Sequence, residues 1–299
     1  MAFTAMIISG LFGALSNLCM RLSMEKHGTA KAFFVFQLTF TFLVTLILCP
    51  LRKQSYDWNA PVLILALITG CSLGLMKVML GKALQKGPPG LTFATVNAAS
   101  VMPALIIVFS VGALIDYHLS SFDFLGLFFV LAGLFWAGWD GSYKRGTGHW
   151  ILFTTSAFAF NVMYMFFTEV RAIISGDKIS LAGIPQANLM ASEWFVPMVF
   201  AAAAGMHTVM FFKRERRIPH TWEVSWGVIG GIFNGLCAFL FVSATEIASL
   251  QESTVIFPIF SISLIIFCNI WGQSLYQEKV NWPANLLCIF GIYVTSLGK

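Results

Sequence analysis

Apolar stretches separated by short polar segments fill this chain almost from end to end. Each is about 18–23 residues long, and a helix of about 20 apolar residues crosses the hydrocarbon core of a bilayer. The pattern therefore predicts an all-α membrane protein with ten transmembrane helices. The predicted spans are about 3–22, 32–50, 60–82, 90–113, 122–140, 149–171, 188–211, 222–244, 250–273 and 282–298. Pro103, Pro197 and Pro258 fall inside predicted spans, where a missing N–H is expected to kink the helix.

The second five stretches read as a weak copy of the first five. The matched positions are Gly70 with Gly231, Gly74 with Gly235, Ala83 with Ala244, Asn17 with Asn161 and Pro103 with Pro258. Close helix packing by itself explains such glycine pairs, and a repeat interface needs the same packing. Because each half holds an odd number of spans, the second copy is inverted in the membrane, as in many secondary transporters. We expect two inverted five-helix repeats, residues 1–140 and 149–299.

Lysine and arginine residues gather on one side of the predicted bundle. Twelve lie in or beside the loops of that side and five on the other, with the densest cluster at 213–217. Cytoplasmic loops carry an excess of these residues. The richer side is therefore predicted to be cytoplasmic, with both termini outside, and the inner (cytoplasmic) membrane of the cell is the expected location.

Composition agrees with a chain that has lipid as its solvent. The sequence is 58% hydrophobic and 10% charged, whereas soluble domains carry about 25% charged residues. Membrane lipid is therefore an expected partner. The net charge of +5 is spread over the loops, which gives no indication of nucleic-acid binding.

Motifs for catalysis or cofactor binding are absent from the sequence. It has no Walker loop, HExxH motif or CxxC pair, so neither ATP hydrolysis nor a bound cofactor or metal is expected. The five histidines, His207 included, lie near the ends of predicted spans, and the six cysteines are expected to be small apolar side chains. The nearest carboxylate pair, Asp116 and Asp123, is separated by a turn. We expect a transporter rather than an enzyme, receptor or scaffold.

Two local patterns accompany the spans. In the first, Ala83-Leu84 closes the third span, and a Gly/Pro turn leads into a fourth span with a central Pro103. In the second, Asp116 is followed by the glycine pair Gly126 and Gly133 in the fifth span.

The second half repeats the second pattern only in part. Gly291 matches a glycine of the pair, while Gly272-Gln273 and Glu278 are alternative matches to the acidic turn.

With these patterns the chain resembles the drug/metabolite transporter (DMT) superfamily, specifically its ten-span EamA-like members. The resemblance covers the whole chain. It implies a central cavity lined mainly by the first, third, fourth, sixth, eighth and ninth helices, with the fifth and tenth at the periphery. Members of this superfamily carry amino acids, nucleotide-linked metabolites, quaternary amines and drugs, so the resemblance implies a carrier but no particular substrate.

Charged side chains at membrane depth are expensive and are therefore candidates for function. Lys77 could bind an anion in the cavity, or its ammonium could extend to the interface. Glu193 could attract cations at the cavity mouth, or be a rim charge beside Trp194. Glu252 could contact substrate together with Gln251, or its carboxylate could interact with the dipole at the start of the ninth helix.

Four asparagines and one tyrosine complete the candidate binding residues. Each asparagine could contact substrate or form hydrogen bonds between helices. Tyr164 lies one turn from Asn161, so that both could face one cavity and stack against a ring or a cation. These residues are Asn17, Asn97, Asn161, Asn234 and Tyr164.

The sequence favours a monomeric carrier of a small-molecule substrate that works by alternating access. The outer side carries more acids than bases, which would draw cationic or zwitterionic solutes. An amino acid or a related amine-bearing metabolite is the first substrate hypothesis. The alternatives are an anionic or nucleotide-type metabolite held by Lys77 and the export of drugs. If Lys77 faces the cavity, protons are a candidate coupling ion.

Overall fold

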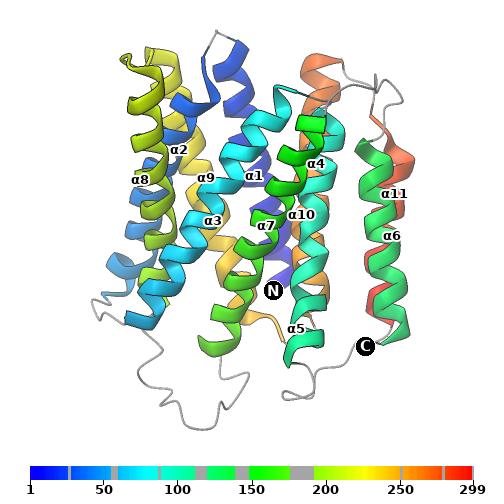
Figure 1. The fold of residues 1–299 in the computed structure, drawn as a ribbon. Helices are drawn as coiled ribbons and strands as arrows, with labels where there is room; N and C mark the ends of the chain where they lie inside the picture. Colours follow the sequence, from blue (N-terminus) through cyan, green and yellow to red (C-terminus); the bar gives the residue numbers. More distant parts are fainter. Residues whose placement is uncertain are drawn as a thin grey trace.

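The computed structural model describes residues 1–25, 28–54, 60–86, 89–111, 120–138, 148–175, 192–249, 252–277 and 280–297. These residues form α-helices joined by short turns and contain no strand, so the described part of the chain is all-α, as predicted (Figure 1). The helices are α1 (Ala2–Glu25), α2 (Ala30–Leu46), α3 (Ala60–Leu84), α4 (Pro89–Ala98), α5 (Met102–Val111), α6 (Ser121–Gly138), α7 (Gly148–Ser175), α8 (Phe195–Glu215), α9 (Thr221–Ile247), α10 (Ser253–Tyr276) and α11 (Trp282–Leu297). The short turns are η1 (Ile47–Leu51), η2 (Ala99–Val101) and η5 (Ser192–Trp194).

Seven of the described helices are long and apolar enough to cross a membrane: α1, α2 with η1, α3, α7, α8, α9 and α10. Two further apolar helices, in α6 and α11, are shorter. The lengths and compositions indicate an integral, multi-pass membrane protein. The helices run up and down in one bundle, and α6 and α11 form a pair at its right-hand edge in Figure 1.

The fourth predicted span is not one continuous helix. It is divided into α4 and α5 by the single turn η2, directly before Pro103. Because proline has no N–H, residue 103 cannot bond the carbonyl of Ala99, and the helix breaks where that bond would form. Pro258 lies inside α10, as predicted, but the prediction for Pro197 is wrong. Pro197 is in the first turn of α8, where a missing N–H costs nothing.

Glycines allow several pairs of helices to approach closely. A Cβ atom at Gly231 of α9 would lie 2.6 Å from both the Gln37 carbonyl oxygen and the Phe40 Cβ of α2. On α3, a Cβ at Gly70 would overlap the backbone of Val199 in α8. Gly126 and Gly291 make the same kind of contact between α6 and α11. Since lipid gives no hydrophobic driving force between helices, such close backbone packing is a main source of their association.

Large apolar side chains fill the space between these close contacts. The main core extends over α1, α2, α3, α7, α8, α9 and α10, and a second core lies between α4, α6, α10 and α11. The largest fully buried apolar side chains are Phe33, Phe195, Phe211, Phe257, Met6, Leu38, Leu134, Ile256 and Val101.

The close approach of α9 to α2 makes Gly231 sensitive to a single added methyl group. We expect Gly231→Ala to lower the free energy of unfolding by about 1–3 kcal/mol, because the new Cβ has no space beside α2. Gly205→Ala in α8 is the matched control, since a Cβ there would meet nothing within 4 Å. Thermal unfolding of the purified protein in detergent measures both variants, and equal unfolding temperatures would contradict the packing argument.

Candidate functional site

Lys77 brings a positive charge into the helix bundle. It lies in α3, seven residues before that helix ends at Leu84, and its side chain is half-buried. The ammonium nitrogen is 4.9 Å from the centroid of the Phe34 ring in α2. It forms no ion pair with any described residue. The charge is therefore stabilised by an aromatic face and not matched by a carboxylate.

His207 and Cys237 bring α8 and α9 to the same place. The Nε2 atom of His207 lies 3.1 Å from the Gly74 carbonyl oxygen, and its ring meets Phe34 edge-on at 5.5 Å. Both His207 and Cys237 lie near Lys77. The prediction that His207 lies near a span end is wrong, because it is 3% exposed and eight residues inside the end of α8.

Tyr164 extends this group toward α7 and α10. Its ring stacks on Phe241 of α9, with centroids 6.5 Å apart, and it lies near Cys237. Phe241 in turn packs against Phe257 and Phe260 of α10, at 5.3 and 4.9 Å. The structure thus groups two predicted site residues, Lys77 and Tyr164, around one thiol. We call Phe34, Lys77, Tyr164, His207 and Cys237 the central cluster.

The asparagines predicted to line the cavity form hydrogen bonds within the protein. Asn161 of α7 donates to the Val96 carbonyl at 2.9 Å, just before the break after α4. Asn97 donates to the Phe93 carbonyl of its own helix at 2.9 Å. These bonds support the packing explanation, and contact with substrate stays a prediction.

Asn234 and Asn17 bridge helices in the same way. Asn234 of α9 donates to the Thr41 hydroxyl of α2 at 3.0 Å. Asn17 of α1 donates to the Cys268 sulfur of α10 at 3.9 Å. Asn17 and Asn161, which match in the sequence repeat, therefore have partners of different chemistry.

A buried polar chain beside Asn234 was not among the predicted site residues. Gln37 of α2 donates to the Ser16 hydroxyl at 2.6 Å, and Ser16 donates to the Gly230 carbonyl at 2.7 Å. Thr41 donates to the Gly231 carbonyl at 3.1 Å. The chain joins α1, α2 and α9. Its sequence signal was the presence of Gln37 inside a predicted span.

The predicted carboxylates lie at helix ends, away from Lys77. Glu193 forms an ion pair with Lys53. The Glu252 carboxylate accepts the Ser249 N–H at 2.8 Å, while its own N–H donates to the Ser249 hydroxyl at 3.2 Å, so it closes the turn before α10. This agrees with the explanation of Glu252 as a residue of the helix start. Gln251 lies outside the described residues.

Glu193 lines a pocket at one end of the bundle. The pocket is a hollow between η1, α7, α8 and α9, and it is partly open to solvent. Its charged lining contains a second ion pair, Arg171 with Glu246. Arg171 is 3% exposed. The lining residues are Cys49, Arg52, Lys53, Arg171, Glu193, Val196, Phe239, Val242, Ser243 and Glu246.

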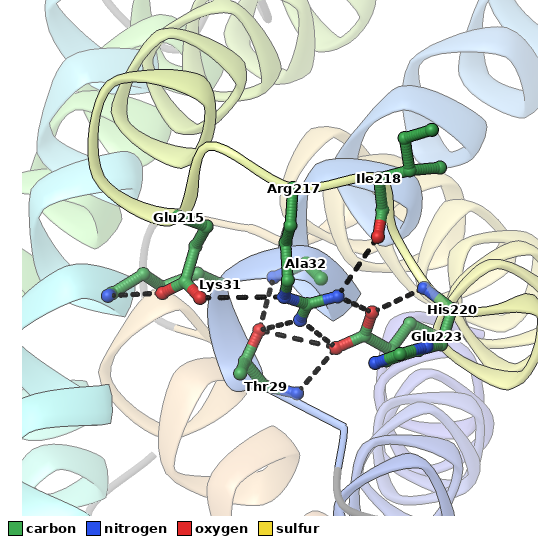
Figure 2. A network of polar contacts seen from close by, with 8 residues as sticks. All are labelled: Thr29, Lys31, Ala32, Glu215, Arg217, Ile218, His220 and Glu223. Atoms are coloured by element: carbon green, nitrogen blue, oxygen red, sulfur yellow. Dashed lines mark hydrogen bonds and ion pairs between the residues drawn. The ribbon is translucent and has the colours of Figure 1, made fainter.

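The opposite end of the bundle is closed by a network of ion pairs and hydrogen bonds (Figure 2). Arg217 donates to both carboxylate oxygens of Glu223, at 2.6 and 2.8 Å, and these bonds raise the pKa of its guanidinium above the usual value. The same carboxylate accepts the N–H groups of Thr29 and His220, each at 2.7 Å. Lys31 pairs with Glu215 at 2.6 Å beside it. Thus the segment before α2 is bound to the α8–α9 connection.

Comparisons with known proteins support the fold but name no activity. A solved crystal structure, described only as that of a protein, matches 97% of this chain over 98% of its own length, with a TM-score of 0.66 and 14% sequence identity. At that identity the likeness concerns the fold alone. No protein-family model and no curated protein matches the chain.

The network around Glu223 is expected to stabilise the folded protein. Glu223 has no exposed surface, and Glu223→Gln removes the charge that its buried hydrogen bonds stabilise. We expect the variant to lose about 3 kcal/mol of unfolding free energy, as when one partner of a buried ion pair is removed.

Glu25→Gln is the control, because the Arg21–Glu25 pair of α1 is an exposed pair at 3.9 Å. Such surface pairs contribute roughly 0.5 kcal/mol. Chemical unfolding in detergent measures both changes, and a loss at Glu223 no larger than at Glu25 would contradict the structural role of the network.

Proposed function

We propose that the protein is a secondary transporter of the ten-span EamA-like type, built from two inverted five-helix repeats. In this proposal α4 and α5 together form the fourth span, and α6 and α11 are the fifth and tenth. The support comes from which helices pack together. If each helix is replaced by its counterpart in the other repeat, α3 becomes α9 and α8 becomes α2. The α3–α8 contact then corresponds to the α9–α2 contact, and both are among the extensive contacts of the bundle.

The close glycine contacts follow the same exchange. Gly70 and Gly74 of α3 face α8, while the repeat-related Gly231 and Gly235 of α9 face α2. The pairs α1–α9 and α7–α3 are likewise exchanged, and the α6–α11 pair is exchanged with itself. Packing that repeats in this way is what two inverted copies of one unit would produce. It also agrees with peripheral fifth and tenth helices.

Lys77 is the observation that supports a substrate class. It is a cation inside the bundle with no carboxylate partner among the described residues. A ligand with an anionic group would provide the missing charge, and the aromatic rings of Phe34 and Tyr164 would contact its apolar part. An amino acid carries such a carboxylate, so it remains the first substrate hypothesis. An anionic or nucleotide-type metabolite is the alternative.

Alternating access needs contacts at both ends that can open in turn. One end has the Lys53–Glu193 pair, and the other has the bonds of Thr29 and Lys31 to Glu223 and Glu215. Each joins a residue of the proposed first repeat to one of the second. Breaking one set while keeping the other would expose the central cluster to one side of the membrane at a time.

Removal of the Lys77 charge tests the proposed transport function. In proteoliposomes, we expect Lys77→Met to reduce substrate uptake at least tenfold and to remove its pH dependence, because methionine keeps the side-chain length and deletes the charge. A thermal-shift screen of wild-type protein with amino acids and with nucleotide-type anions selects the substrate beforehand. Lys82→Met is the matched control. Lys82 lies on the same helix over the Phe153 ring, outside the central cluster.

Wild-type uptake by the Lys77→Met protein would reject a binding role for this residue. A substrate that emerges chemically altered would instead favour an enzyme. Stabilisation of the wild-type protein only by nucleotide-type anions would replace the amino-acid hypothesis with its alternative.

The proposed topology has its own test. A single cysteine in place of Lys213 should react with an impermeant maleimide only from the cytoplasmic side, because the positive-inside rule assigns segment 213–217 to the cytoplasm. A cysteine at position 299 should react only from outside. Labelling with the reverse sidedness in intact cells and inverted vesicles would overturn the orientation.

A further inference from the structure

The pocket at the Glu193 end has features of a binding site separate from the central cluster. None of the central-cluster residues lines it. It is a hollow that is partly open to solvent. Phe239, Val196 and Val242 provide an apolar wall, and charged side chains surround it.

The charges of the lining residues do not balance. Two of the three cations are paired, Lys53 with Glu193 and Arg171 with Glu246. Arg52 is the third, and it forms no ion pair with a described residue. Its guanidinium carbon lies 5.0 Å from the centroid of the Phe239 ring. The lining therefore has one unmatched positive charge, held over an aromatic face at the edge of an apolar wall.

We propose that this pocket binds a small monocarboxylate, with the carboxylate on the Arg52 guanidinium and the apolar part against Phe239. Arginine binds carboxylates through two parallel hydrogen bonds, which gives such a site its geometry. The Glu193 and Glu246 carboxylates can accept an ammonium group, so an α-amino acid fits as well as a simple acid. A dianion does not fit, because its second charge would meet those carboxylates.

The site gives the proposed carrier a first contact for its substrate at one mouth of the bundle. Only this role as an entry site rests on the proposed function, because binding can be measured without transport. The remaining charge attracts a carboxylate from solution, and the two ion pairs beside it join α2 to α8 and α7 to α9 through the residues at their ends.

Alkylation at position 243 measures occupancy of this pocket alone. Ser243 is half-buried and lines the pocket, so Ser243→Cys introduces a thiol that a bound ligand would cover. The purified full-length variant in detergent is treated with N-ethylmaleimide, and mass spectrometry quantifies modification of residue 243. The probes are propionate, which has only a carboxylate, alanine, which has a carboxylate and an ammonium group, and ethylamine, which has only an ammonium group. We expect propionate and alanine to slow alkylation and ethylamine to have no effect.

Variants in the Ser243→Cys background separate this pocket from the central cluster. Arg52→Gln should raise the half-protective concentrations of propionate and alanine at least about tenfold, because a charged hydrogen-bond partner is lost. Arg214→Gln, an exposed arginine near the other end of the bundle, is the matched control and should change nothing. Lys77→Met should also leave protection intact.

The proposal is overturned if ethylamine protects residue 243 from alkylation and propionate does not, or if no probe protects it. It is also overturned if propionate and alanine protect the Arg52→Gln variant at the same concentrations as its parent. Loss of protection in Lys77→Met would overturn the separation of the two sites. Protection that follows the expected pattern, in a protein that moves no substrate in proteoliposomes, would keep this site and reject the transport function.

Discussion

The close contact between α9 and α2 is the interaction on which the centre of the molecule depends. Its glycines let two backbones approach until side-chain hydroxyls reach carbonyl oxygens of the facing helix, as Thr41 reaches Gly231. In hydrocarbon these bonds have no competition from water. Cys237 follows on the next part of α9, near Lys77 of α3 and Tyr164 of α7.

Much of the helical architecture could be predicted from the sequence, because lipid demands long apolar segments. Helices lie at the predicted segments in the described residues, although the fourth segment is divided into α4 and α5. The break before Pro103 follows from the chemistry of one residue. The start of α8 could not be predicted. Apolar character continues before that helix and does not reveal where the first turn forms, so Pro197 was expected several turns inside a span.

The candidate site was less predictable, since residue type and depth do not define a helix face. Lys77 and Tyr164 both belong to the central cluster, whereas Glu193 forms an ion pair with Lys53 at the end of the bundle. Cys237 and His207 were missed because a neutral thiol and a single imidazole look like ordinary helix residues in a sequence. A clue to Cys237 was its place two residues after Gly235, close to the α9–α2 contact.

The break between α4 and α5 has a consequence for the energy landscape of the protein. A broken helix is held to α7 through the bond from Asn161 to Val96. Hydrogen bonds between membrane helices contribute about 1 kcal/mol, so this bond changes the ratio of two arrangements by less than about tenfold. Because α4 also packs against α6 and α7, this bond is one of several contributions that hold the broken segment in place.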